Sequence, residues 1–167
     1  MANNPLQELF MDELKDVYNA ENQILKALPM MAKAAHSDDV RNAFQMHEEQ
    51  TRGQVQRLDQ IFDMRGMKPQ GKKCMGMEGI IEEGNQMMHQ GLQGPALDAA
   101  LIASAQKVEH YEMATYGTLR TWAQELGDNQ AAKLLQQTLD EEGDTDHKLT
   151  ALAERRVNLQ AEKQSMR

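Results

Sequence analysis

The chain of 167 residues carries a formal net charge of −8, and only 4% of its residues are aromatic. The negative charge disfavours binding to nucleic-acid phosphates, and the one cysteine excludes an internal disulfide and fits a reducing compartment. No stretch approaches the roughly 20 apolar residues of a membrane span, and the N-terminus lacks the apolar run of a secretory signal. We therefore expect a soluble, cytoplasmic protein that binds neither nucleic acid nor membrane.

Helix-forming residues dominate the composition, whereas the β-branched and aromatic residues of strands are scarce, so the sequence predicts an all-α protein. Helices are expected over residues 5–35, 38–65, 95–127 and 128–162, within a single domain spanning residues 1–167. Asn4 is a candidate N-cap before Pro5 at the first helical position, and Asp128 is a candidate N-cap for the last helix.

The connection between the second and third helices is long, because residues 66–94 are rich in glycine and contain only one plausible short helix, MEGIIEEGNQMMHQ. The other two connections are short and predict antiparallel helix hairpins. A connection of this length can return along a whole helix, which makes the second and third long helices parallel. Two hairpins joined by such a crossover predict a ferritin-like four-helix bundle.

Each long helix has an apolar stripe with steps of three and four residues, and polar side chains interrupt every stripe near its midpoint. The interruptions are Glu21 in the first helix, His47, Gln50 and Gln54 in the second, Glu112 in the third, and Glu142 and Asp146 in the fourth. Side-by-side packing of the helices would bring these residues to one height in the bundle.

Several carboxylates inside an apolar bundle need compensating cations, because burial and like charges both penalise the ionised forms. No lysine or arginine lies in the stripes near this layer, whereas carboxylates and imidazole suit iron, and also manganese or zinc. Glu109, one turn before Glu112, would add a further ligand. The alternative is a buried hydrogen-bond network without metal.

Five motifs, in one order over about residues 5–155, resemble the YciE/YciF stress-protein family of the ferritin-like superfamily. They are AENQILKALP, HEEQTRGQVQRLDQIF, CMGMEGIIEEGN, SAQKVEHYEMATYGTL and LLQQTLDEEGDTDHKLTALA. The resemblance implies the four-helix fold and a dinuclear metal centre. It supports as metal-centre residues Glu21, Glu109, Glu112, Glu142 and Asp146. The two Glu-x-x-His pairs typical of ferritin-like sites are absent, with Asp146 where a histidine is expected and Gln50 where a glutamate is expected. The centre would therefore hold metal weakly, hold one ion instead of two, or be the relic of a metal site.

These observations favour a dimetal-carboxylate protein that handles iron, oxygen or peroxide under stress. In this hypothesis Glu21 and Glu109 are terminal ligands and Glu112 and Glu142 bridge, with His47, Gln50 and Asp146 completing the site. Tyr18 and Tyr111, which lie close in sequence to the ligands, are candidate hydrogen-bond donors to their carboxylates. The alternative is a non-enzymatic helical stress protein with a structural or weakly metal-binding polar layer. The methionine-rich crossover predicts a homodimer.

Overall fold

The computed structural model describes residues 4–164, which contain helices and connecting loops and no strand. The elements are α1 (Pro5–Ala34), α2 (Asp38–Met64), α3 (Met75–His89), α4 (Gly94–Glu125), α5 (Asn129–Leu152), a π-helical segment (Ala153–Val157) and α6 (Asn158–Glu162). The all-α prediction is confirmed. The expected domain over residues 1–167 includes residues 1–3 and 165–167, which lie outside the described part.

Capping side chains define where the long helices begin. The side-chain oxygen of Asn4 accepts the Leu6 N–H at 3.0 Å, and Ser37 and Asp128 make the corresponding contacts at the starts of α2 and α5. Gly127, with φ of 75°, provides the left-handed conformation that separates α4 from α5. These local signals account for the agreement of the predicted helix starts with the structure to within a few residues.

The last helix departs from the prediction, because the expected continuous helix over residues 128–162 is divided by the π-helical segment. Leu149, Ala153 and Val157 are all buried in one apolar cluster, although they are spaced four residues apart. A spacing of four drifts away from a 3.6-residue helical face, and the wider π-helical turn keeps all three side chains facing the core. Arg156 also pairs with Asp39 at the start of α2, which holds this segment against the bundle.

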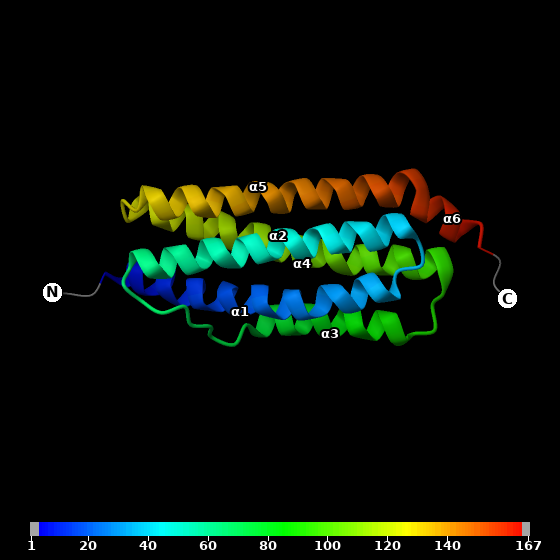
Figure 1. Ribbon diagram of the computed structural model, residues 1–167, viewed down its shortest axis with the longest axis horizontal. Helices are drawn as coiled ribbons and strands as arrows, with labels where there is room; N and C mark the ends of the chain where they lie inside the picture. Colours follow the sequence, from blue (N-terminus) through cyan, green and yellow to red (C-terminus); the bar gives the residue numbers. More distant parts are fainter. Residues whose placement is uncertain (1–3, 165–167) are drawn as a thin grey trace.

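The helices form two antiparallel hairpins, α1–α2 and α4–α5, joined by the crossover that carries α3 (Figure 1). Helix α1 packs beside α4 and α2 beside α5, while α3 lies on the outside against α1 and α4. Figure 1 shows α2 and α4 running in the same direction, as the long crossover predicts for a ferritin-like bundle. None of the described helices is both long and apolar enough to span a lipid bilayer.

The core consists of two apolar clusters, one toward each end of the bundle, with polar side chains between them. Helix α1 passes from Val17 in one cluster to Ile24 in the other, and Glu21 lies between them. Helix α4 passes from Val108 to Tyr116 with Glu112 between. The interruptions of the stripes therefore fall between two separately packed apolar regions.

Candidate metal centre

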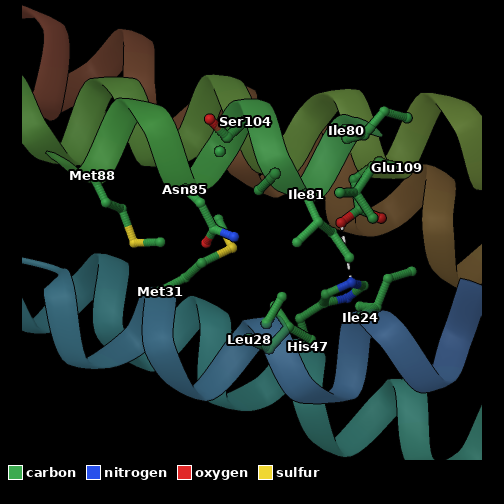
Figure 2. A pocket seen from close by; sticks show the side chains of 14 residues that line it. Ile24, Leu28, Met31, His47, Ile80, Ile81, Asn85, Met88, Ser104 and Glu109 are labelled. Atoms are coloured by element: carbon green, nitrogen blue, oxygen red, sulfur yellow. Dashed lines mark ion pairs between the residues drawn. The ribbon is translucent and has the colours of Figure 1, made fainter. Parts of the chain in front are cut away.

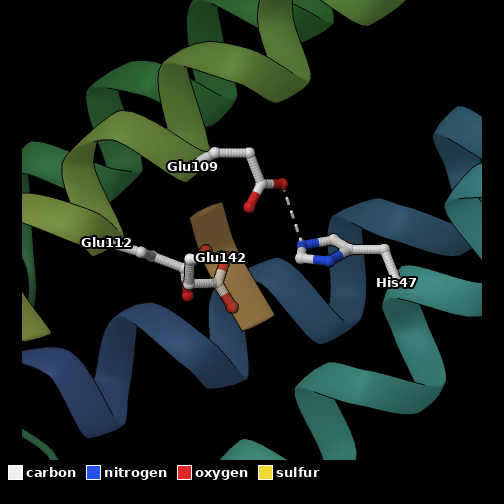
Figure 3. Close-up of side chains that lie close together, drawn as sticks. All are labelled: His47, Glu109, Glu112 and Glu142. Carbon is white, nitrogen blue, oxygen red and sulfur yellow. Dashed lines mark ion pairs between the residues drawn. The ribbon is translucent and has the colours of Figure 1, made fainter. Parts of the chain in front are cut away.

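Four buried side chains from three helices converge between the two apolar clusters (Figure 3). Helix α2 provides His47, α4 provides Glu109 and Glu112, and α5 provides Glu142. Each offers one ligand atom, and these atoms all lie within 4.8 Å of one another. The cluster of His47, Glu109, Glu112 and Glu142 is called the inner cluster below.

The closest approach between His47 and a carboxylate of the inner cluster is 3.2 Å, from His47 Nε2 to Glu109 Oε1 (Figure 3). Neither ring nitrogen has a hydrogen-bond partner in the described chain. Burial lowers the pKa of His47 against the opposing effect of the Glu142 charge, which favours the neutral imidazole. A neutral ring with a lone pair beside a carboxylate is the state in which histidine binds metal ions.

The carboxylates of the inner cluster disfavour one another's ionised forms. Burial raises the pKa of Glu109 to about 12, and the adjacent Glu142 carboxylate raises it further. Burial also raises the pKa of Glu112, followed by the charges of Glu142 and Glu21. Both oxygens of Glu109 and both of Glu112 lack a hydrogen-bond donor. No lysine or arginine side chain of the described residues forms an ion pair with these carboxylates.

Glu21 of α1 lies on the other side of Glu112 and has a donor from the protein. The buried Tyr116 hydroxyl donates a hydrogen bond to Glu21 Oε1, while Glu21 Oε2 remains unpaired. Burial and the charge of Glu142 raise the pKa of Glu21 to about 8, and the Tyr116 hydrogen bond opposes this rise. Glu21 and Tyr116 are called the closed end of the polar layer, and His47 and Glu109 are called its open end.

Tyr116 was not identified as a donor from the sequence, and the two tyrosines that were suggested point elsewhere. Tyr18 packs edge-on against Phe62, and the Tyr111 hydroxyl lies 3.1 Å from Cys74 Sγ. Tyr116 follows Glu112 by four residues and so lies on the same face of α4. That spacing is the signal that was available in the sequence.

Gln54 holds the remaining carboxylate of the inner cluster in place. Its fully buried amide Nε2 donates to Glu142 Oε1 and also lies 3.3 Å from Glu141 Oε2. Arg57 binds the Glu141 carboxylate through two nitrogens. Arg57, Glu141 and Gln54 therefore form a chain of contacts from the surface of α2 and α5 to Glu142.

Two predicted ligands, Gln50 and Asp146, are not brought into the inner cluster. Gln50 Oε1 accepts a hydrogen bond from Thr145 Oγ1 at 3.3 Å. Asp146 Oδ1 accepts from Gln106 Nε2 at 3.2 Å and lies 3.3 Å from Nε2 of the largely exposed His110. Both side chains are half-buried and are engaged by residues at the edges of the bundle.

The donor set of the inner cluster and Glu21 fits a divalent transition metal. Four carboxylates and one neutral imidazole are ligands of the type that iron, manganese and zinc accept. Their unpaired buried oxygens and nitrogens would each be costly without a partner, and a bound cation would satisfy several of them together.

The fold and this carboxylate layer define a ferritin-like helical-bundle protein. The sequence profile of the DUF892 family, described as a domain of unknown function, matches residues 5–162, and the chain belongs to this family. Protein YciF of Escherichia coli K12 is 47% identical over 158 residues, which cover 94% of this chain and 95% of YciF. The resemblance found in the sequence motifs is thereby confirmed.

Solved structures agree with this assignment. The crystal structure of the E. coli stress protein YciF has a TM-score of 0.88 at 46% identity and covers 95% of this chain and 99% of that one. YcfI of Rhodopseudomonas palustris, for which a structural role has been suggested, has a TM-score of 0.85 at 41% identity over 87% of this chain and 92% of its own. A Xanthomonas campestris protein with a TM-score of 0.74 at 18% identity supports the fold alone.

Proposed function

We propose that this chain is a metal-carboxylate protein of the stress response that binds iron and handles iron, oxygen or peroxide. The observation that carries the proposal is the inner cluster, in which both imidazole nitrogens and every carboxylate oxygen except Glu142 Oε1 lack a hydrogen-bond partner, and no lysine or arginine of the described residues pairs with them. The relation to a protein named as a stress protein supports the physiological context.

In this proposal His47, Glu109, Glu112 and Glu142 hold one ion, and Glu21 shares Glu112 and Glu142 with a second. Gln50 and Asp146 lie at the edge of this site, where Thr145 and Gln106 bind them. Bound Fe(II) would supply electrons to oxygen or peroxide at open coordination positions. Manganese and zinc are compatible with the same ligands.

The protein's own contribution is to exclude water and to fix the ligands before the metal binds. The two apolar clusters enclose the polar layer, Gln54 orients Glu142, and burial keeps His47 neutral. Ligands held by such neighbouring contacts bind metals more tightly than mobile ones.

The proposal is tested by thermal unfolding of chelator-treated protein with and without Fe(II) or Mn(II) under anaerobic conditions. Binding to the native state alone adds about 2.7 kcal/mol at a hundredfold excess over Kd, which corresponds to roughly 5–10 °C for a chain of this size. Glu142→Gln should abolish the rise, because it removes a charge of the inner cluster while keeping an acceptor for Gln54.

A second candidate function is a non-enzymatic structural role, and the suggested role of YcfI favours it. In that case the polar layer is a hydrogen-bond network held by Tyr116 and Gln54. The wild type would then ignore both metals, and Glu142→Gln would lower the stability of the metal-free protein by about 1–3 kcal/mol. Under the metal proposal the same substitution is neutral or stabilising without metal, because it relieves like-charge crowding.

We also propose that the protein is a homodimer formed through α3. Met75 of this helix is 67% exposed, and Met87 and Met88 are half-buried. An apolar surface of this kind favours self-association. Sedimentation at micromolar concentration should give the dimer mass, and Met75→Glu should shift it toward the monomer; a wild-type monomer would contradict the proposal.

A further inference from the structure

Two cavities reach the polar layer, and both reach it at the open end, at His47 and Glu109. The smaller, about 30 Å³, lies between α1, α3 and α4; Figure 2 shows it with His47 and Glu109 at one end and Met31 and Met88 at the other. The larger, about 90 Å³, lies between α2, α4 and α5. It is called the α2–α5 chamber below.

The α2–α5 chamber follows from the helical spacing of its walls. Ala43 precedes His47 by one turn on α2, and Ala105 precedes Glu109 by one turn on α4. These small side chains leave space beside the two ligands where larger residues would close the bundle. Phe44 and Leu149 complete a predominantly apolar wall, and the exposed Lys148 lies at the mouth.

One side of the chamber is polar and offers hydrogen bonds. Gln50 and Thr145 both line it, and the Thr145 hydroxyl donates to Gln50 Oε1. No residue of the described chain accepts a hydrogen bond from the Gln50 amide nitrogen, so its two hydrogens remain available as donors. His47 and Glu109, buried and without hydrogen-bond partners, form the inner end.

We propose that the α2–α5 chamber binds hydrogen peroxide at the open end of the polar layer, with Gln50 as the residue that recognises it; this inference rests on the proposed metal-binding function. The position of Gln50 outside the inner cluster is then explained, because it lines the chamber beside His47 and Glu109 instead of replacing a carboxylate ligand.

The size and charge of the chamber select this class of ligand. A water molecule needs at least about 10–15 Å³ of this kind of volume, so a space of about 90 Å³ admits a molecule of two oxygen atoms. Apolar walls and the Lys148 charge at the mouth disfavour metal cations. Peroxide both donates and accepts hydrogen bonds, which suits the Gln50 amide as donor and the Thr145 hydroxyl oxygen as acceptor, both in the chamber wall.

The chamber itself is tested on metal-free protein with xenon, a neutral apolar probe. Xenon-induced NMR shifts should map to residues around Ala43 in the wild type and disappear in Ala43→Leu, whose side chain fills the chamber. Gly84→Ala is the matched control: it lines the smaller cavity, its added Cβ makes an ordinary 3.5 Å contact with Ser104, and it should keep the xenon shifts. Wild-type protein without xenon shifts at the α2–α5 chamber would overturn the inference.

The ligand assignment is tested by single-turnover oxidation of anaerobically Fe(II)-loaded protein with hydrogen peroxide or dioxygen. Ala43→Leu should slow oxidation by peroxide about tenfold or more while keeping the metal-induced rise in melting temperature, and Gly84→Ala should not slow it. Gln50→Leu should slow peroxide several-fold more than dioxygen, since only peroxide needs the amide donor. Unchanged rates in Ala43→Leu, or an unchanged peroxide-to-dioxygen ratio in Gln50→Leu, would refute the assignment.

The two proposals can fail separately. If the wild type shows xenon shifts but no metal-induced rise in melting temperature, the metal proposal fails. The chamber then stands as a cavity with no bound Fe(II) to reduce peroxide, which refutes the peroxide assignment. If metal binds but xenon does not enter beside Ala43, the chamber inference alone is overturned.

Discussion

The closed and open ends of the polar layer are equally buried but differ in how their polar atoms are satisfied. At the closed end, Glu21 receives a hydrogen bond from the fully buried Tyr116. At the open end, His47 and Glu109 approach each other to 3.2 Å without hydrogen-bond geometry, and two cavities border them.

This difference separates groups that serve the fold from groups left available to a ligand. A buried carboxylate with a donor can be kept for structural reasons, whereas unpaired buried groups are expensive and are retained chiefly where something binds them. The two ends should therefore respond differently to pH, to metal and to substitution.

The largest effect should be the pH dependence of the metal-free protein. Because the pKa of Glu21 is raised to about 8 and those of Glu109 and Glu112 are also raised, the folded state binds more protons than the unfolded state above about pH 4.5. Stability is therefore fully present below that pH and should fall by several kcal/mol as the pH rises through 8. Urea midpoints measured in chelator across this range test the slope.

Metal should reverse this slope, because its ligands must be deprotonated and binding releases protons. With Mn(II) present, the stabilisation relative to chelator should grow with pH. Glu21→Gln removes one titrating group and should flatten the metal-free curve near pH 8. A metal-free protein whose stability is constant from pH 5 to 8 would contradict the raised pKa values at both ends.

Replacing one carboxylate at each end by leucine should have opposite effects on the metal-free protein. Glu21→Leu leaves the Tyr116 hydroxyl buried without its acceptor and should cost about 1–3 kcal/mol. Glu109→Leu removes a carboxylate whose oxygens have no donor, while Glu142 keeps its bond from Gln54. Its effect should lie between zero and a gain of about 2 kcal/mol.

Urea unfolding of both variants in chelator measures this contrast, and addition of Mn(II) supplies the control. Glu109→Leu should lose the metal-induced stabilisation, and Glu21→Leu should lose the part that comes from the second ion. Equal destabilisation by the two substitutions would mean that the ends do not differ in polar satisfaction.

Local signals predicted the fold because each acts within a few residues. Asn4 and Asp128 cap helices at the positions expected from their sequence context, and the length of the crossover predicted the parallel course of α2 and α4. The π-helical segment was missed because it depends on which face of α5 is buried at the end of the bundle. That is a tertiary property which the local sequence does not specify.

Periodicity placed the polar residues at one height, but it did not determine their partners. Glu21 and Gln54 are buried, as their places in the stripes predicted, yet the donation from Tyr116 to Glu21 joins residues 95 apart in the chain. Helix rotation of a few tens of degrees decides whether a residue four positions after a ligand points inward or along the helix boundary. Asp146, four residues after Glu142, points along the helix boundary, and the sequence pattern of one helix does not indicate this orientation.

The smallest effect should therefore come from Asp146, on which the sequence and the structure differ most. Its carboxylate is held by Gln106 and lies beside His110 at a partly exposed edge, where such contacts contribute about 1 kcal/mol or less. Asp146→Asn keeps the acceptor for Gln106 and should change the stability by less than about 0.5 kcal/mol. It should shift the midpoint of an Mn(II) titration by no more than about twofold, because the carboxylate would have to leave both partners to reach the inner cluster. Glu109→Gln, which alters the open end directly, is the positive control and should weaken binding by at least about tenfold. If Asp146→Asn weakens Mn(II) binding as much as Glu109→Gln does, then metal binding draws Asp146 inward, and the open end of the layer extends along α5 beyond His47 and Glu109.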